Sequence, residues 1–560
     1  MMDQKILLAL LPYWTPLIPP QGIAGLKVFL EAHGFRVKTV DANVENPFKK
    51  IYQGYFQTLQ TYIPRSHWGN FYNIGHDVLR NHMMACFNRT EEPAYLELVK
   101  LLIYNTFFRE FNDRQVKELN DHIERFYREL ARYFLRLLET EKPAVVGLTA
   151  HLGTLAACMF CHRLAKAHCS DILTVLGGTI FAGELPIDSP DFQLLMEKTP
   201  YIDKMIVGEG EVLLLKLLQG ELPESRRVFT AADIQYRSVD IDSKALPDFS
   251  DFDLPHYPYM AAYASRSCPH QCRFCNVAAF FGEYRHKSVK QTVADLIELQ
   301  RRYGYQLYFM TDSLLNPVMD ELAGELIVRG LSIYMDTYMR VSEEVADIDR
   351  AILWRRAGLY RVRMGIETGS PRMLDLMGKN ITVEQSRAAL TALAAAGIKT
   401  TAYFVIGFPG ETEADFLETL DFVAEMKSDI WEVECNPFYY YYTGQPNADQ
   451  WAAKRKLLYP ESVRQLLISQ TWVLDCEPRR PERFRRLFRF TEHCRQLGIP
   501  NPYSSMEIYQ ADERWKSLHA NAVPSMIEFE DNSAYIDENK AVKRLLLARD
   551  TGRDEGDFLL

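Results

Sequence analysis

The sequence of 560 residues predicts an α/β protein built from two successive series of alternating strands and helices. Three observations support this prediction. Strand-like and helix-like patterns alternate up to about residue 220 and again from about residue 259 to 445. The chain is too long for one hydrophobic core, which suggests two to four domains. Three closely spaced cysteines, Cys268, Cys272 and Cys275, stand near the start of the second series.

The composition is that of an ordinary globular protein. A formal net charge of −10 argues against a general nucleic-acid binder. No apolar run approaches the roughly 18 residues of a membrane span. The short apolar stretch Ile6–Leu11 lacks a small-residue cleavage site, so it predicts a buried strand rather than a signal peptide. We therefore expect a cytoplasmic protein with reduced cysteines and with neither nucleic acid nor membrane as a partner.

Residues 1–240 predict a Rossmann-like, doubly wound domain. A strand, the turn Pro19-Pro20-Gln21-Gly22, an apolar helical face and a second strand form a βαβ unit, and the alternation resumes near residue 144. Folds of this type bind ligands beyond the carboxyl ends of their strands. No G-x-G-x-x-G motif is present, so a dinucleotide ligand is weakly supported. The expected strands are Lys5–Leu11, Arg36–Val40, Ala144–Leu148, Leu173–Leu176 and Lys204–Val207.

Residues 44–140 interrupt this alternation and predict an inserted helical layer rich in aromatic side chains. The insertion could pack against the sheet or form a cap that faces a substrate. The polar stretch 220–250 is expected to be a linker between the two series.

Residues 250–445 predict a partial (β/α)6 barrel, whose site should lie at the carboxyl ends of the strands. The three cysteines directly follow the first expected strand. The aromatic run Phe438–Tyr442 follows the sixth strand and could line a substrate pocket or pack in the core. The expected strands are Ala261–Ser265, Leu307–Thr311, Ser332–Tyr338, Arg361–Ile366, Thr400–Ile406 and Ile430–Glu434.

Residues 446–560 predict a helical C-terminal domain that could cap the substrate. Its arginine-rich run, from Arg479 to Arg489, is typical of a solvated helix face. The alternative is a docking site for an acidic substrate or a leader peptide.

The spacing C-x3-C-x2-C of the three cysteines favours an iron–sulfur cluster over zinc. Structural zinc normally takes four ligands from two close pairs, whereas Cys435, Cys476 and Cys494 are isolated and distant. Thiolates hold iron–sulfur clusters, and three of them leave one iron of a four-iron cluster open for another ligand. Zinc and chance spacing remain alternatives.

The cysteine motif, with Phe274 before its last cysteine, resembles that of the radical S-adenosylmethionine superfamily. The stretches Met364–Ser370 and Val405–Thr412 strengthen this resemblance, which covers about residues 259–445. Residues 1–240 resemble the cobalamin-binding domain that precedes many such enzymes, through Pro19–Gly22, Val146–Thr149, Gly177-Gly178 and Gly208–Glu211. The chain thus resembles a cobalamin-dependent radical S-adenosylmethionine enzyme of the C-methyltransferase-like branch.

The resemblance implies three cofactors: a 4Fe-4S cluster, S-adenosylmethionine and cobalamin. It also implies that reductive cleavage of S-adenosylmethionine yields a 5′-deoxyadenosyl radical, which abstracts a hydrogen from an unactivated carbon. In methylating members, methylcobalamin then supplies the methyl group. An external electron donor such as flavodoxin or ferredoxin, and a small-molecule or peptide substrate, are the implied partners.

The resemblance also implies roles for particular residues. Cys268, Cys272 and Cys275 are the expected catalytic cluster ligands. Around S-adenosylmethionine we expect contacts from Phe274, Asp312, Ser313, Arg340, Gly365, Glu367 and Gly407. Arg340 could pair with the methionine carboxylate or be a surface residue. Around cobalamin we expect Pro20, Gln21, Thr149, His151, Gly177, Gly178, Thr179, Gly208, Glu209 and Gly210.

The lower ligand of cobalt is not specified by the sequence. The motif Asp-x-His-x-x-Gly, whose histidine ligates cobalt in many cobalamin proteins, is absent. His151 could be a ligand, could pack beneath the corrin, or could be an ordinary loop histidine. The pair Cys158 and Cys161 is interpreted as two buried helix cysteines rather than a redox motif.

The leading hypothesis is radical C-methylation of an unactivated carbon in a natural product or peptide. A second hypothesis keeps the cofactors but ends in rearrangement, oxidation or cyclisation. A third is a non-catalytic protein that binds the cluster or cobalamin. Methylthiolation is disfavoured, because no second three-cysteine site occurs upstream.

Overall fold

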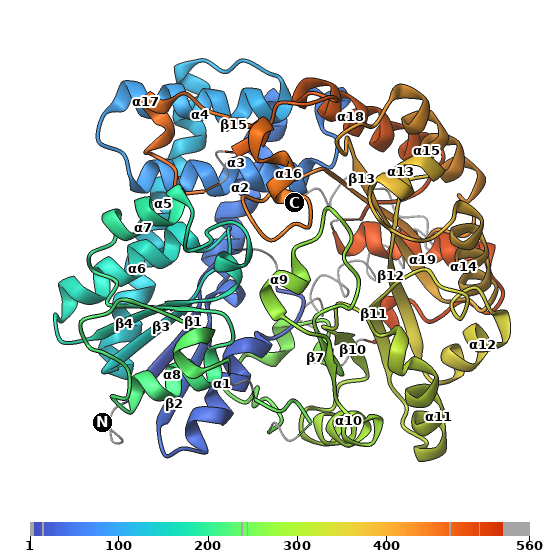
Figure 1. The fold of residues 1–560 in the computed structure, drawn as a ribbon, viewed down its shortest axis with the longest axis horizontal. Helices are drawn as coiled ribbons and strands as arrows, with labels where there is room; N and C mark the ends of the chain where they lie inside the picture. Colours follow the sequence, from blue (N-terminus) through green and yellow to red (C-terminus); the bar gives the residue numbers. More distant parts are fainter. Residues whose placement is uncertain are drawn as a thin grey trace, which may run out of the picture.

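A computed structural model describes residues 5–13, 16–236, 239–242, 245–469, 472–502 and 504–529. Figure 1 shows two sheets side by side, with the helical layer of residues 46–141 beside the first and the C-terminal helices of residues 480–518 beside the second. The predicted fold class is confirmed: an α/β chain with a Rossmann-like domain, a helical insertion and a barrel domain. Residues 530–560 of the predicted C-terminal domain lie outside the described residues.

The first sheet has six strands in the order β2-β1-β3-β4-β5-β6, all paired in parallel. The sixth strand corrects the prediction of a linker over 220–250, because Val228–Thr230 pairs with β5. This strand has only three residues and polar neighbours, so its apolar pattern is too short to predict a strand from the sequence. The strands are β1 Lys5–Leu10, β2 Arg36–Asp41, β3 Val145–Thr149, β4 Leu173–Gly177, β5 Lys204–Val207 and β6 Val228–Thr230.

The helices of this domain follow the strands as predicted, and the insertion forms a separate layer of four helices. In α5 the buried residues recur every three or four positions, so one face packs inward while the other is charged. The domain helices are α1 Gln21–Glu31, α6 Leu155–His168, α7 Pro190–Lys198 and α8 Gly210–Leu218. The insertion helices are α2 Asn46–Tyr62, α3 Phe71–Phe87, α4 Glu92–Phe107 and α5 Asp113–Glu141.

The second sheet contains the six predicted strands in sequential order, β14-β13-β12-β11-β10-β7, again all parallel. This is the partial barrel that six βα repeats predict. Its strands are β7 Met260–Ala262, β10 Leu307–Met310, β11 Tyr334–Met339, β12 Leu359–Glu367, β13 Lys399–Ile406 and β14 Glu432–Pro437. Its helices are α9 Val277–Phe281, α10 Val289–Tyr303, α11 Met319–Arg329, α12 Ile348–Arg356, α13 Pro371–Leu376, α14 Val383–Ala395 and α15 Glu413–Glu425.

Two short antiparallel strand pairs were not predicted. The pair β8 Ser265–Arg266 and β9 Arg285–His286 encloses the cysteine loop. The pair β15 Arg455–Leu457 and β16 Trp472–Leu474 lies in the C-terminal region, which is otherwise helical. The C-terminal helices are α16 Ala448–Trp451, α17 Glu461–Arg464, α18 Arg480–Gln496 and α19 Ser505–Leu518.

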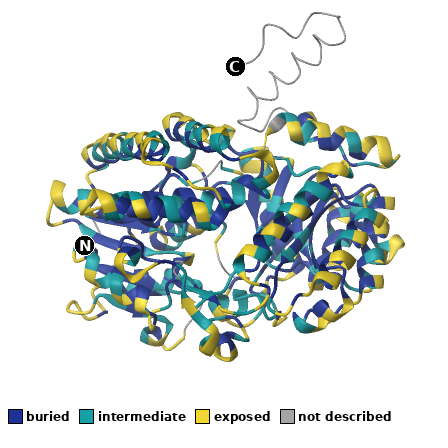
Figure 2. Cartoon of the chain, turned by 90° about the horizontal axis from the view of Figure 1, so that it is seen from above, coloured by how far each residue is buried: buried dark blue, intermediate teal, exposed yellow. Residues whose placement is uncertain are grey.

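Both sheets are buried on both faces. Figure 2 shows dark blue strands between helices whose outward surfaces are exposed. Central strands such as β1 and β12 are almost entirely inaccessible, which is expected for parallel sheets covered by helices. No helix in the described ranges is long and apolar enough to cross a membrane.

A buried ion pair fastens the C-terminal helix α19 to the start of the barrel strand β13. Lys399 Nζ lies 2.5 Å from Asp512 Oδ1, and both side chains are at most 2% exposed. Asp512 also accepts hydrogen bonds from Trp431 Nε1 and Ser525 Oγ, while Lys399 donates to Tyr360. Burial lowers the pKa of Lys399 to about 8.

Replacing Asp512 with alanine should destabilise the barrel strongly, because it leaves Lys399 buried without its anion. The expected loss is about 3–5 kcal/mol, visible as a lower Tm. Asp475→Ala is the matched control, since it breaks an exposed ion pair with Lys456 and should leave Tm unchanged. An unchanged Tm in Asp512→Ala would contradict the role of this pair.

His162 on α6 should make the folded state sensitive to acid. Both ring nitrogens are buried and without a hydrogen-bond partner among the described residues, and burial lowers the pKa of His162 to about 3. Below the unfolded pKa of about 6.5 only the unfolded chain takes up this proton, so stability falls as pH falls, by about 2 kcal/mol at pH 5.

Thermal unfolding at pH 8 and pH 5 checks this prediction. His162→Leu should lose less Tm on acidification than the wild type, whereas His168→Leu, at an exposed position on the same helix, should behave like the wild type. Equal acid sensitivity of His162→Leu and the wild type would be evidence against it.

Candidate functional site

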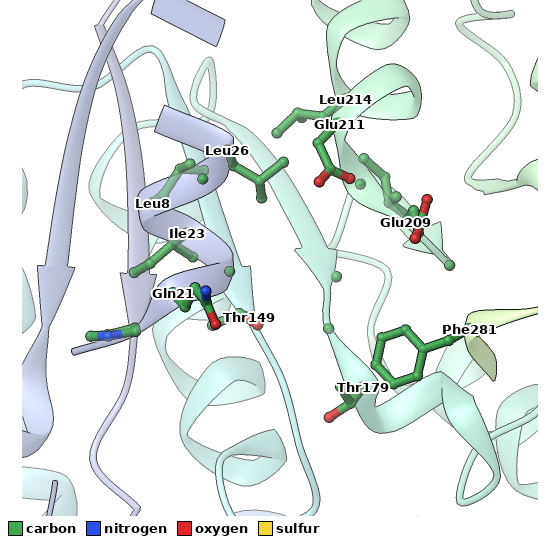
Figure 3. A pocket seen from close by; sticks show the side chains of 18 of the residues that line it. Leu8, Gln21, Ile23, Leu26, Thr149, Thr179, Glu209, Glu211, Leu214 and Phe281 are labelled. Atoms are coloured by element: carbon green, nitrogen blue, oxygen red, sulfur yellow. The ribbon is translucent and has the colours of Figure 1, made fainter. Parts of the chain in front are cut away.

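A cavity of about 500 Å³ opens at the carboxyl edge of the first sheet, where doubly wound folds bind ligands. Figure 3 shows Leu8, Gln21, Ile23 and Thr149 on one side of the cavity and Thr179, Glu209 and Phe281 on the other. Every residue expected around cobalamin lines this one cavity: Pro20, Gln21, Thr149, His151, Gly177, Gly178, Thr179, Gly208, Glu209 and Gly210.

Glycines let the backbone border the cavity closely. Gly208 follows β5 with φ +107°, and a Cβ there would point into open space. Gly178 follows β4 with φ +111°, and a Cβ there would lie 2.4 Å from the carbonyl oxygen of Ala150. Both conformations favour glycine, so the two strand ends present main chain rather than side chain to a ligand.

The second domain supplies the opposite wall of the same cavity. Phe280 and Phe281 of α9 and Ser313 after β10 line it, and Thr311 Oγ1 donates a 2.6 Å hydrogen bond to Gln21 Oε1 across the boundary. Ser313, expected at S-adenosylmethionine, therefore lies on the side of this cavity. No sequence pattern marked the two phenylalanines, because they stand beyond the cysteine motif in an unpredicted short helix.

Ion pairs close the boundary between the domains. Glu209 Oε1 lies 2.8 Å from Arg266 and 2.5 Å from Arg285, and Arg266 also pairs with Glu211 at 3.1 Å. Burial acts to lower the pKa of Arg266, but Glu211 and Glu209 outweigh it and raise that pKa, so Arg266 stays charged. Glu209 was expected to contact a cofactor. It lines the cavity, but its carboxylate forms ion pairs across the domain boundary.

His151 lies at the cavity wall in the turn between β3 and α6. Its ring centroid is 5.4 Å from that of Tyr13, and burial lowers the pKa of His151 to about 4, so the ring is neutral at neutral pH. A neutral imidazole can pack against or ligate a metal. Cys158 and Cys161 are buried on α6, and burial raises the pKa of the Cys158 thiol to about 12, as expected for structural cysteines.

The cysteine loop runs from β8 to α9, at the mouth of the barrel. Cys272 is buried, and Cys268 and Cys275 are half-buried. Asp312, after β10, fixes the base of the loop: its carboxylate accepts from Ser265 Oγ at 2.6 Å and from Ala264 N at 3.1 Å. Its predicted contact with the methionine amino group remains a prediction.

Arg340, after β11, points toward the cysteines. Its Nη1 lies 3.2 Å from Cys272 Sγ, so a guanidinium stands beside the loop that would hold an anionic ligand. Its predicted pairing with the methionine carboxylate stays a prediction.

A second group of predicted residues lies at the ends of β12 and β13. Glu367 has φ +70°, a strained conformation for a residue with a side chain, and Lys379 Nζ donates to its Oε1 at 2.6 Å. A side chain at Gly365 would collide with both groups. Phe274 lies beneath this pair, with its ring centroid 5.7 Å from Lys379 Nζ.

Gly407 begins the turn after β13, and the C-terminal helix α18 supports it. Gly407 N donates to Glu411 Oε2 at 3.1 Å, and Arg486 Nη1 donates to the same oxygen at 2.8 Å. Arg486 is buried, which the interpretation of the arginine run as a solvated face did not anticipate.

The residues present fit the implied cofactors. Gln21 Nε2 is buried at the first cavity and has no hydrogen-bond partner among the described residues, so it offers a free donor to a ligand. No three potential ligands in the described ranges converge closely enough for a single metal ion. A four-iron cluster binds each cysteine through a different iron, so its thiolates stand further apart than those around one ion.

Comparison with protein families finds a match in the second domain. Residues 263–423 match the family model of the Radical SAM superfamily. The match spans the cysteine loop and the strand ends that carry Arg340, Glu367 and Gly407.

Curated relatives match about half of the chain. An anaerobic magnesium-protoporphyrin IX monomethyl ester cyclase from Rubrivivax gelatinosus is 28% identical over 321 residues, which are 52% of this chain and 56% of that protein. An uncharacterised methyltransferase from Pyrococcus horikoshii is 26% identical over 316 residues, which are 52% of this chain and 67% of that protein. The chain thus spans between about half and two thirds of these relatives' lengths.

Solved structures resemble nearly the whole chain. The radical S-adenosylmethionine methyltransferase TsrM from Kitasatospora setae, with cobalamin and a [4Fe-4S] cluster bound, superposes with a TM-score of 0.58 over 98% of this chain and all of that one, at 14% identity. The cobalamin-dependent enzyme OxsB gives 0.52 over 99% of this chain and 62% of that one, also at 14% identity. Residues 263–423 are therefore a radical S-adenosylmethionine domain, in a chain with the fold of cobalamin-dependent enzymes of that superfamily.

Proposed function

We propose that this protein is a cobalamin-dependent radical S-adenosylmethionine enzyme that methylates an unactivated carbon of a small molecule or peptide. The observation that carries the proposal is the composition of the first cavity. Residues of both domains line it, and Ser267 next to Cys268 is among them. A cofactor on the edge of the first sheet would therefore lie beside the cysteine loop.

The chain's own residues position the bound groups and exclude water from them. Cys268, Cys272 and Cys275 would hold the 4Fe-4S cluster, and Arg340 and Lys379 would supply positive charge beside S-adenosylmethionine. When bound, these cofactors and cobalamin would supply a carbon-centred radical and a transferable methyl group. The strand-end glycines and the amide of Gln21 would bind cobalamin. We further propose that a small redox protein, such as flavodoxin or ferredoxin, delivers the electron.

Cyclisation is the second candidate, because three curated relatives are named as cyclases. It would use the same cofactors without transfer of a methyl group.

An isotope-labelling assay separates the two candidates. The anaerobically reconstituted protein is supplied with trideuteromethyl S-adenosylmethionine and with fractionated small molecules and peptides. Methylation predicts S-adenosylhomocysteine, 5′-deoxyadenosine and a product that carries the deuterated methyl group. A product without that label, formed with 5′-deoxyadenosine alone, would refute methylation.

Cys272→Ala should abolish the iron–sulfur absorbance and all cleavage of S-adenosylmethionine, since two thiolates cannot hold the cluster. Cobalamin absorbance should persist, because the first cavity is lined by other residues. Cys169→Ala, an exposed cysteine, is the control and should keep both signals. Turnover by Cys272→Ala would overturn the cluster assignment.

Gln21→Met should weaken cobalamin binding by about threefold to tenfold, as expected for loss of one neutral hydrogen bond. Titration of the anaerobic protein with hydroxocobalamin, followed by absorbance, measures the Kd. Gln219→Met, at an exposed position after α8, should not change it. Equal affinity of Gln21→Met and the wild type would show that the Gln21 amide does not face the ligand.

A further inference from the structure

A second, smaller cavity of about 70 Å³ lies where the helical insertion, the barrel and the C-terminal region meet. We call it the tyrosine cavity. Tyr439, Tyr440, Tyr441 and Tyr442 of the aromatic run line it, after the end of β14. Its charged lining residues are Asp77, Glu184, Asp191, Arg480 and Arg483.

The tyrosine cavity adjoins the cysteine loop. Gln445 Nε2 donates to both Phe274 O and Tyr439 O at 2.9 Å, which ties the aromatic run to the loop. Gly183, another lining residue, packs against Asn276, whose Nδ2 donates to Ala182 O at 3.2 Å. The cavity thus stands on the side of the barrel mouth where the proposed reaction would occur.

Two arginines of α18 differ from the others on the same helix. Arg485, Arg486, Arg489 and Arg495 each pair with a glutamate. Arg480 and Arg483 have no carboxylate within ion-pair distance in the described part of the chain, and both line the tyrosine cavity. Both donate instead to main-chain carbonyls: Arg480 Nε to Asn105 O at 2.9 Å, Arg483 Nη1 to Phe438 O at 3.2 Å and Arg483 Nη2 to Pro478 O at 3.4 Å.

Arg483 is the more deeply buried of the two. It is 4% exposed, and its Nε is inaccessible and has no hydrogen-bond partner in the described ranges. Burial and the neighbouring Arg480 lower the pKa of Arg483 to about 10, which still leaves it charged at neutral pH. A buried guanidinium without an anion is costly, so this site favours a ligand that supplies one.

Among the described residues, the carboxylates that line the cavity do not form ion pairs with Arg480 or Arg483. Asp77 pairs with Arg80 and accepts from Tyr439 Oη at 2.7 Å. Asp191 pairs with Arg464 at 2.7 Å. Burial raises the pKa of Glu184 to about 6, and the charge of Arg80 opposes this shift. The two arginines therefore form a positive end of the cavity that no carboxylate described here neutralises.

We propose that the tyrosine cavity is a substrate subsite that binds a carboxylate through Arg480 and Arg483. The inference rests on the proposed function, since it takes the space beside the cysteine loop as the reaction space. A carboxylate is planar, matches the fork of a guanidinium and can lie between tyrosine rings. The small volume suits this one group, so the rest of the substrate would extend toward the cysteine loop.

Binding of benzoate to the intact, cofactor-loaded protein tests the proposal without knowledge of the natural substrate. Saturation-transfer NMR under anaerobic conditions measures the Kd of benzoate and of its neutral analogue benzamide. Benzoate should bind more tightly than benzamide. Arg480→Gln and Arg483→Gln should each weaken benzoate about tenfold or more and leave benzamide unaffected.

Arg485→Gln is the matched control, because Arg485 is on the same helix but is exposed and paired with Glu482. It should bind benzoate like the wild type. Arg480 is less buried than Arg483, so its variant keeps the test valid if Arg483→Gln does not fold. Equal binding of benzoate and benzamide, or full benzoate affinity in Arg480→Gln, would overturn the proposal. The absorbance spectrum of the same samples shows whether the cluster and cobalamin are bound. A failure of the proposed function would therefore be detected separately from a failure of benzoate binding.

Discussion

The docking of the first sheet's edge against the barrel mouth is the constraint on which the site depends. Glu209 pairs with Arg266 and Arg285, and Gln21 accepts from Thr311, so five chain segments from two domains meet beside one cavity. Arg266 stands two residues before Cys268. The contacts that close the domain boundary therefore also fix the start of the cysteine loop, and the positions of the two proposed cofactor sites are coupled by geometry.

The C-terminal region supports this arrangement from the other side. Arg486 of α18 holds the Glu411 turn that follows β13, and Asp512 of α19 neutralises Lys399 at the start of the same strand. Both pairs are buried, and a buried ion pair is costly to break. The helix α18 thus combines support for the barrel, through Arg486, with the two arginines that face the tyrosine cavity.

Periodicity and strand-end motifs made much of the fold predictable. Both parallel sheets are runs of apolar strands, and glycines such as Gly178 and Gly208 mark the ends where a ligand can approach. The strand β6 was not predicted, because three residues are too few to show the alternating hydrophobic pattern of a strand. The wall formed by Phe280 and Phe281, the ion pairs of Glu209 and the burial of Arg483 depend on how distant segments dock. Local sequence does not encode that information.

The central claim is that the cysteine loop and the first cavity hold two cofactors in one shared space. Electron paramagnetic resonance on the intact protein, with the cluster reduced and cobalamin in its cob(II)alamin form, tests it most directly. The account predicts that each centre broadens and accelerates the relaxation of the other, and that this coupling disappears in Cys272→Ala. Two spectra that simply add, each identical to that of its centre alone, would contradict it.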